Sequence, residues 1–169
     1  MRTALALLLL VSALPARAAL AVPASVEDLA RSSQAVVRGR VAKLTSRWSE
    51  DQRRIFTYVE IAPSSVWRGA PPSRVTVLVP GGVVGPIGQR VDGAPTFAKD
   101  EDVVVFLSEA EAGAFRVTGL AQGKFKVDAD AARPDLSHTS FVEAPLRAME
   151  RRAEPMPVAE LERRVRSVQ

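Results

Sequence analysis

VVRGRVAKL, residues 36–44, decides the fold together with IFTYVEI at residues 55–61. In the first stretch, valine and glycine alternate with arginine and alanine, which is the two-residue period of a half-buried strand. The second stretch is rich in β-branched and aromatic residues and continues past Pro63 to Trp67. Gly39 predicts a bend or bulge in the first strand, and Pro63, which has no N–H for a ladder, predicts an edge or bulge in the second. We therefore expect two long, curled strands.

Three more strands complete the expected sheet. They lie at residues 74–79, 103–107 and 114–127, the last interrupted by a kink at residues 121–122. The run at residues 103–107 is apolar throughout, which is typical of a strand buried on both faces. Residues 80–95 are rich in glycine and predict a shaped excursion with a short strand at residues 89–91. Five strands with glycine kinks favour a mainly β fold, a five-stranded antiparallel barrel of the OB type.

Short helices are expected at both ends of the mature chain. Ser25, followed by Glu27 and Asp28, predicts an N-cap with acidic residues in the first turn of a short helix. Residues 158–168 carry valine and leucine at helical spacing, which predicts a C-terminal amphipathic helix. The preceding segment lacks a sustained period, although residues 143–152 are compatible with a helix. The expected organisation is a signal peptide at residues 1–21, a barrel domain at 22–128, and an irregular segment with a C-terminal helix at 129–169.

The first two dozen residues consist of a positively charged start, an apolar run and several small residues. This order is typical of a secretory signal peptide. Cleavage after Ala18 and cleavage after Ala21 both fit the preference for small residues, and we favour the second, which makes Val22 the mature N-terminus. Proline and arginine break the apolar run short of the roughly 20 residues that cross a bilayer. We expect an exported protein, periplasmic or extracellular, with no membrane span after signal removal.

The composition excludes several classes of protein. The chain of 169 residues contains no cysteine, which rules out disulfides and thiolate metal sites. It has 23 basic and 19 acidic residues, and the expected signal peptide contains two of the basic residues and no acid. The remaining excess of two positive charges is too small for the concentrated basic surface of a nucleic-acid-binding protein. We therefore expect no nucleic acid as a partner.

The residues that carry chemistry in other proteins do not form a recognisable set here. His138 is the single histidine, and no G-x-S-x-G motif accompanies it. The acidic triplet at residues 100–102 suits a hard cation, but it is also typical of a solvated loop before a strand. Gly123-Lys124 lacks the upstream glycine and the following serine or threonine of a P-loop. We expect no catalytic residue, no metal, no cofactor and no enzymatic activity.

Two tryptophans are the candidate partner contacts. Trp48 lies in the expected loop at residues 46–54, and Trp67 lies at the end of the second long strand. An aromatic side chain at a strand end either closes the mouth of a barrel or stays exposed as a contact for a partner. Both alternatives remain open for Trp48, and closure of the core is favoured for Trp67.

Two sets of short motifs carry resemblances. The first set is SVEDLA at residues 25–30, SQAVVRGRV at 33–41, YVEI at 58–61, VWRG at 66–69 and DVVVFL at 102–107. In this order they resemble the netrin-like module of tissue inhibitors of metalloproteinases, and the resemblance implies an OB barrel that binds proteins. In that family an N-terminal cysteine chelates the protease zinc, and this cysteine-free chain has no matching residue. The second set, PGG at 80–82, GAPTF at 93–97 and GLAQGKF at 119–125, resembles a group of uncharacterised exported bacterial proteins.

These observations predict an exported, non-catalytic binding module whose partner is a protein that the sequence does not name. The alternative is a structural or accessory subunit of a cell-envelope assembly that docks through its C-terminal helix. The two differ in what they expose. A binding module should expose Trp48 and an open face or the glycine-rich segment, whereas an assembly subunit should leave Val158, Leu161 and Val165 uncovered.

Overall fold

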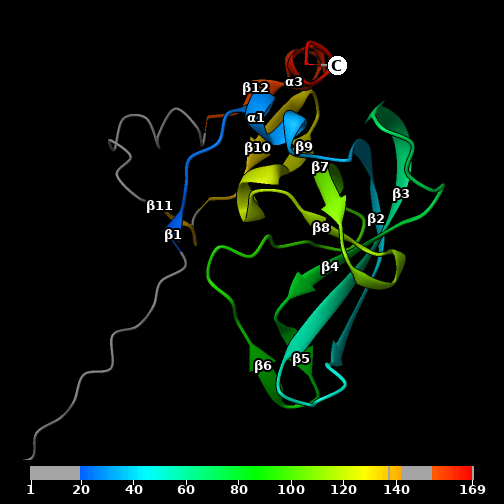
Figure 1. The fold of residues 1–169 in the computed structure, drawn as a ribbon, viewed down its shortest axis with the longest axis vertical. Helices are drawn as coiled ribbons and strands as arrows, with labels where there is room; N and C mark the ends of the chain where they lie inside the picture. The colour runs from blue at the N-terminus through cyan, green and yellow to red at the C-terminus, as the bar shows by residue number, and fades with distance from the viewer. Residues whose placement is uncertain (1–19, 137, 142–153, 169) are drawn as a thin grey trace, which may run out of the picture.

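The computed structural model describes residues 20–136, 138–141 and 154–168, which form a barrel with two helices packed at one end (Figure 1). Most of the expected signal peptide, including Ala18, and the helix expected at residues 143–152 lie outside the described residues. No helix within the described ranges reaches the length and hydropathy of a segment that crosses a membrane.

Five strands form a closed barrel. They are β2 (Ala35–Trp48), β3 (Ile55–Arg68), β4 (Val75–Pro80), β7 (Asp102–Glu109) and β8 (Phe115–Val117). Their closed order is β2–β3–β4–β8–β7–β2, and every pairing is antiparallel except the parallel pairing of β4 with β8. Numbered along the chain, the five barrel strands follow the order 1-2-3-5-4. The structure confirms the expected mainly β, OB-like barrel and corrects its antiparallel description to a mixed one.

The hairpin of β2 and β3 bends where its glycine and proline predict. The register of the two strands shifts next to Gly39, which pairs with Pro63. A Cβ atom on Gly39 would lie 2.5 Å from the carbonyl oxygen of Ala62, so only glycine fits this position. The irregularity curls the hairpin and helps the sheet to close. β2 extends to Trp48, which pairs with Ile55, so the expected loop begins after Trp48 and not before it.

Strand β7 is buried on both faces, as its apolar sequence predicts. Val103, Val105 and Leu107 belong to the core inside the barrel. Val104 and Phe106 belong to a second core, which lies between the outer face of the sheet and the helices. β2 pairs with one edge of β7, and the other edge is shared by β8 and β9 (Lys124–Asp128).

The sheet continues beyond the barrel, which the sequence did not predict. The expected strand at residues 114–127 is two strands, β8 and β9, separated by a 3-10 turn (Leu120–Gly123) that follows Gly119 at φ 70°. The segment expected to be irregular contains β10 (Ala131–Pro134), which pairs with β9, and β12 (Met156–Pro157), which pairs with β10. One core includes residues from both sides of residue 128, so the expected boundary there does not separate two cores.

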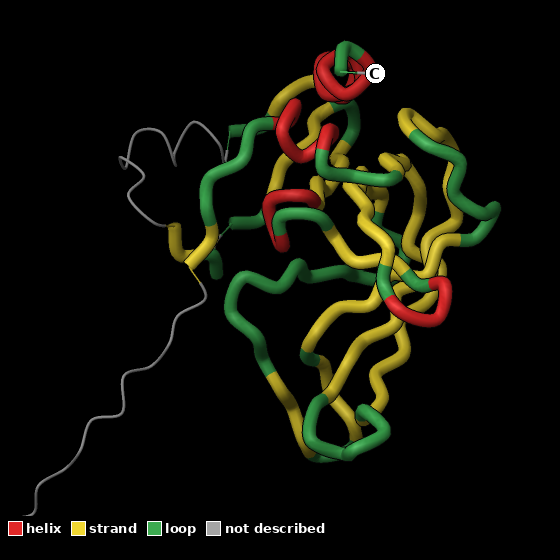
Figure 2. Tube along the Cα trace, in the orientation of Figure 1, coloured by secondary structure: helices red, strands yellow, loops and turns green. Residues whose placement is uncertain are grey.

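The glycine-rich segment forms a small hairpin beside the barrel. β5 (Gly82–Val84) pairs with β6 (Ile87–Gln89), so the short strand lies two residues before its expected position. Residues 90–101 then run from β6 to β7 without regular secondary structure (Figure 2). Near the start of the described residues, β1 (Leu20–Ala21) pairs with β11 (Ser140–Phe141), so Ala21 lies in a strand.

Both helices that flank the barrel are present where the sequence predicts them. α1 (Val26–Arg31) begins after Ser25, whose side chain accepts a hydrogen bond from Asp28 N in a capping box. α3 (Val158–Arg166) contributes its valine and leucine side chains to the second core. The two helices therefore cover the outer face of the sheet around β7.

We expect Gly39→Ala to lower the free energy of unfolding by about 2 kcal/mol, because the added Cβ collides with the Ala62 carbonyl and displaces the hairpin. Gly88→Ala is the matched control, because a Cβ there meets only a Val83 methyl group at 3.8 Å. The control should change stability by less than about 0.5 kcal/mol. Urea denaturation followed by circular dichroism measures both variants, and equal stability would contradict the steric role of Gly39.

Candidate functional site

The candidate site is the end of the barrel that lies opposite the two helices. There the β2–β3 turn and the β5–β6 hairpin lie together, at the bottom of the view in Figure 1. Two hydrogen bonds join them: Gly81 N donates to Ile55 O at 2.7 Å, and Ile55 N donates to Gln89 Oε1 at 2.6 Å. The hairpin therefore extends one wall of the barrel past the ends of its strands.

Behind this wall lies a cavity of about 480 Å³, which we call the barrel-mouth cavity. Its volume falls within the range of about 300–1,000 Å³ that is typical of small-molecule sites. Its lining includes Leu44, Val59 and Val79, which also contact the core inside the barrel, so the cavity begins where that core ends. Val83 of β5 and Phe97 of the connection to β7 add further apolar surface.

Two hydroxyl groups of the lining are bonded to each other and to the backbone. Thr57 Oγ1 donates to the carbonyl oxygen of Gly81 at 2.8 Å. Ser46 Oγ lies 2.9 Å from Thr57 Oγ1 and is the donor of that bond, because the Thr57 proton is already used. A Cβ atom on Gly82, whose φ is 136°, would collide with both hydroxyls, so glycine is required there. Both hydroxyl protons are therefore used within the lining.

The titratable residues that line the cavity, among those the structure describes, are Arg90 and His138. Both are exposed. His138 is joined to the glycine-rich segment through its backbone, because its carbonyl oxygen accepts a hydrogen bond from Gly93 N at 2.8 Å. The guanidinium of Arg90 has no ion-pair partner within the described part of the chain. The Arg90 guanidinium is therefore available to bind an anionic ligand.

One amide side chain, that of Gln89, and one further hydroxyl side chain, that of Thr96, complete the polar lining. Gln89 Oε1 accepts from Ile55 N, so the remaining group of this side chain, Nε2, is a donor and has no partner among the described residues. Thr96 Oγ1 donates to the carboxylate of Asp135 at 3.2 Å. Donors thus belong to the Gln89 and Arg90 side of the cavity, and a carboxylate lies next to Thr96.

A buried ion pair fixes the connection that carries Phe97. Lys124 Nζ on β9 lies 2.6 Å from Glu101 Oε1, and both side chains are more than nine-tenths buried. Glu101 Oε2 accepts from Ala98 N at 3.0 Å, and Lys124 Nζ lies 5.3 Å from the centre of the Phe97 ring. Breaking such a pair would leave an uncompensated buried charge, so the pair holds its neighbours in place. Lys124 is therefore a structural residue of the cavity wall.

The acidic triplet at residues 100–102 does not gather at one point. Asp102 pairs with Arg38 of β2 at 2.7 Å, whereas Glu101 binds Lys124. Glu101 is therefore not the solvated residue that the loop composition predicts. Within the described ranges, no group of three or more histidine, aspartate or glutamate side chains is placed to hold a metal ion.

The structure separates the two tryptophans. Trp67 is 1% exposed and packs in the core beneath the helices, which agrees with the closure of the core that its sequence position favoured over exposure as a partner contact. Trp48 is 38% exposed at the end of β2, next to the β2–β3 turn. Its neighbour Arg47 lies 5.4 Å from the centre of the Tyr58 ring. Trp48 is thus the predicted contact residue that belongs to the candidate site.

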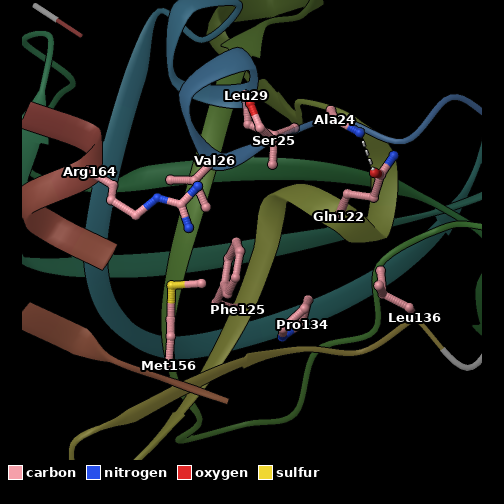
Figure 3. A pocket seen from close by; sticks show the side chains of 10 residues that line it. All are labelled: Ala24, Ser25, Val26, Leu29, Gln122, Phe125, Pro134, Leu136, Met156 and Arg164. Carbon is pink, nitrogen blue, oxygen red and sulfur yellow. Dashed lines mark hydrogen bonds between the residues drawn. The ribbon is translucent and has the colours of Figure 1, made fainter. Parts of the chain in front are cut away.

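A second, smaller cavity of about 200 Å³ lies between α1, β9 and β10 (Figure 3). The side chains that give it polarity already have partners. Gln122 Oε1 accepts from Ala24 N at 2.9 Å, and Gln122 Nε2 donates to Val22 O at 3.0 Å. Arg164 is bound by Glu27. This cavity is a gap in the packing, whereas the barrel-mouth cavity has a cation and an amide donor that lack partners among the described residues.

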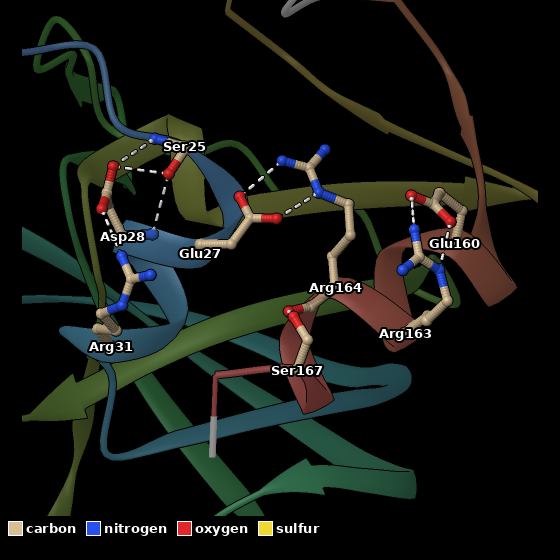
Figure 4. Close-up of polar contacts among 8 residues, drawn as sticks. All are labelled: Ser25, Glu27, Asp28, Arg31, Glu160, Arg163, Arg164 and Ser167. Atoms are coloured by element: carbon tan, nitrogen blue, oxygen red, sulfur yellow. Dashed lines mark hydrogen bonds and ion pairs between the residues drawn. The ribbon is translucent and has the colours of Figure 1, made fainter.

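The apolar side of α3 is covered by the protein's own core. Val158, Leu161 and Val165 are all buried in the cluster that includes Phe106 and Trp67. Outside this cluster, α3 is tied to α1 by polar contacts (Figure 4). The stripe that an assembly subunit should expose is therefore not on the surface.

Comparison of the chain with models of known protein families finds no match, and comparison with curated proteins finds none either. The function of this chain is therefore inferred from the geometry of the site. Sequence reasoning predicted the shaped glycine segment that forms one wall. It missed the residues this segment meets, because Ser46 and Thr57 look like ordinary strand residues and Arg90 like an ordinary loop residue.

We expect Lys124→Met to lower the free energy of unfolding by about 3–5 kcal/mol, because it leaves the Glu101 carboxylate buried and unpaired. Lys126→Met changes an exposed lysine on the same strand and should change stability by less than about 0.5 kcal/mol. The double variant Lys124→Met/Glu101→Gln removes the charge but keeps an acceptor for Ala98 N, so it should recover part of the loss. Urea denaturation measures the free energy of unfolding of all three variants. An equal loss of stability in Lys124→Met and Lys126→Met would disprove the role of the ion pair.

The ion pair of α1 and α3 predicts a pH dependence of stability. Arg164 donates two hydrogen bonds of 2.7 Å to Glu27 (Figure 4). This interaction, above all the hydrogen bonding, holds the pKa of Glu27 below its ordinary value of 4.5. A carboxyl whose pKa is lowered by folding stabilises the protein above its ordinary pKa, and that contribution disappears as the pH falls through the lowered value.

We therefore expect Glu27→Gln to be less stable than the wild type at neutral pH, with a gap that narrows as the pH falls below 4.5. Arg164→Gln removes the partner and should flatten the same part of the pH profile. Urea midpoints measured from about pH 7 to pH 3 test both variants. A gap between Glu27→Gln and the wild type that stays constant over this range would contradict the assignment.

Proposed function

We propose that this chain is an exported, non-catalytic module that binds another protein through the open end of its barrel. The observation that carries the proposal is where the exposed apolar side chains lie. Seven large apolar side chains are exposed in the described residues, and four of them belong to the segments around the barrel-mouth cavity. These four, which we call the barrel-end patch, are Trp48, Val83, Ile87 and Val91.

The side chains at the open end of the barrel are arranged as in a protein interface. Exposed apolar side chains that gather at one end of a protein mark contact sites. Val83 and Ile87 lie on opposite faces of the β5–β6 hairpin, because Ile87 pairs with Val84, so both faces of the hairpin expose an apolar side chain. Tryptophan is enriched among the residues that dominate binding energy, and Trp48 lies on the same face of β2 as Ser46, which lines the cavity. The cavity beside the patch gives it depth, and Arg90 contributes to a polar rim. An apolar centre with a polar rim is the usual arrangement of a protein interface.

Two further considerations support the same proposal. The resemblance to the netrin-like module implies protein binding by an OB barrel, although the cysteine that inhibits proteases in that family has no counterpart here. The expected signal peptide implies a periplasmic or extracellular partner. We propose a non-catalytic role because, among the described lining residues, His138 stands at the cavity without a carboxylate to orient it.

The alternative function, an accessory subunit of an envelope assembly that docks through α3, has less support. Its docking surface would have to be the polar outer side of the helix, since the apolar side is buried. That polar side carries Glu160, Glu162, Arg163 and Arg166, which pair among themselves as Glu160 with Arg163 and Glu162 with Arg166. Charges that are already paired on an exposed helix contribute little to docking.

Site-specific photo-crosslinking tests the proposal. A photo-reactive amino acid at Ile87, expressed in the source cells, should form an adduct with a partner protein that survives denaturing purification. The same amino acid at Val66 is the matched control, because Val66 is also exposed but lies at the opposite end of β3. Adducts of equal yield at the two positions would show that the barrel end has no special role.

Truncation of the aromatic side chain should then weaken the complex. Trp48→Ala, combined with the photo-reactive residue at Ile87, should reduce the adduct several-fold, since loss of a central aromatic costs on the order of 2 kcal/mol of binding energy. Val66→Ala in the same background should leave the yield unchanged. An unchanged yield with Trp48→Ala would remove this tryptophan from the interface.

A further inference from the structure

The barrel-mouth cavity combines a closed apolar floor with a cation at its opening. Leu44, Val59 and Val79 line its inner part, and Phe97 lies against them. The titratable members of the described lining are Arg90 and the single histidine, and Arg90 is the cation. From this combination we infer that the cavity binds a small amphipathic carboxylate, with its apolar tail on the floor and its carboxylate against Arg90.

The hydroxyl groups of the lining decide the orientation of such a ligand. The Thr57 proton goes to Gly81 O, and the Ser46 proton goes to Thr57 Oγ1. Only oxygen lone pairs remain there, and lone pairs repel a carboxylate. The tail, which needs no hydrogen bond and gains from leaving water, therefore occupies the inner part.

The donors of the lining decide where the carboxylate lies. Arg90 has a planar guanidinium that matches a carboxylate with two parallel hydrogen bonds, and Gln89 Nε2 on the preceding residue is a second donor. Charge therefore places the head group on the side of Arg90 and Gln89.

This inference goes beyond the proposed binding of a protein and does not depend on it. Trp48 and Ile87 of the barrel-end patch lie outside the lining of the cavity, whereas Val83 and Val91 also line it, so the two sites overlap only in part. A negative crosslinking result would leave ligand binding intact. Failure of ligand binding would leave the protein interface intact.

Isothermal titration calorimetry of the purified mature protein with decanoate tests the inference. Decan-1-ol and decyltrimethylammonium, with the same tail and a neutral or cationic head, are the matched probes. We expect decanoate to bind at least about tenfold more tightly than decyltrimethylammonium, because only the anion gains the charge-assisted bonds to Arg90. Decan-1-ol should lie between them.

Two variants localise the ligand. Arg90→Gln changes an exposed side chain, should leave the melting temperature unchanged, and should weaken decanoate about five- to tenfold with little effect on decan-1-ol. Arg116→Gln, another exposed arginine on β8, is the control and should bind decanoate like the wild type. Ala94→Phe fills the cavity and should abolish binding of both probes, provided its melting curve shows that it folds.

Three outcomes would overturn the inference. Equal affinity for decanoate and decyltrimethylammonium would mean that the cavity takes any apolar chain. An equal effect of Arg90→Gln and Arg116→Gln would mean that the carboxylate is held elsewhere. No decanoate binding by a folded protein that still forms the Ile87 adduct would mean that the cavity takes no small carboxylate, although the barrel end contacts a partner.

Discussion

Strand β7 holds the structure together because both of its faces and both of its edges are occupied. Val103, Val105 and Leu107 pack inside the barrel, while Val104 and Phe106 pack in the core beneath the helices. One edge pairs with β2, and the other is shared by β8, which closes the barrel, and β9, which extends the sheet. A polar side chain at any of these positions would be buried without a partner, so the apolar run is a physical requirement.

The candidate site is a consequence of how this central strand is covered. The helices pack over the outer core at one end of the molecule, and the opposite end of the barrel is left to the β5–β6 hairpin and the connection to β7. Along the strands the same inward-facing row passes from fully buried Val41 and Val77 to Leu44 and Val79 at the cavity. The buried ion pair of Lys124 with Glu101 fixes the irregular connection from β6 to β7, which forms part of the cavity wall.

Local signals in the sequence were enough for the main elements of the fold. Gly39 and Pro63 marked the bend of the hairpin, and Ser25 marked the start of the first helix, because backbone conformation at these positions depends on neighbouring residues. The pattern was misleading at Lys124. Lys124 alternates with buried Phe125, yet it is itself buried, because its partner Glu101 lies 23 residues away along the chain.

The sequence by itself determined a mainly β barrel with a doubly buried strand and a helix before and after it in the chain. These features follow from hydrophobic period and from glycine, proline and capping residues, which act over a few positions. Tertiary structure alone decided that Trp67 is covered while Trp48 is exposed, that β9 leaves the barrel, and that Ser46, Thr57 and Arg90 line one cavity. The physical reason is that burial and side-chain contacts depend on residues that are far apart in the sequence. Such residues come together only after the sheet has closed.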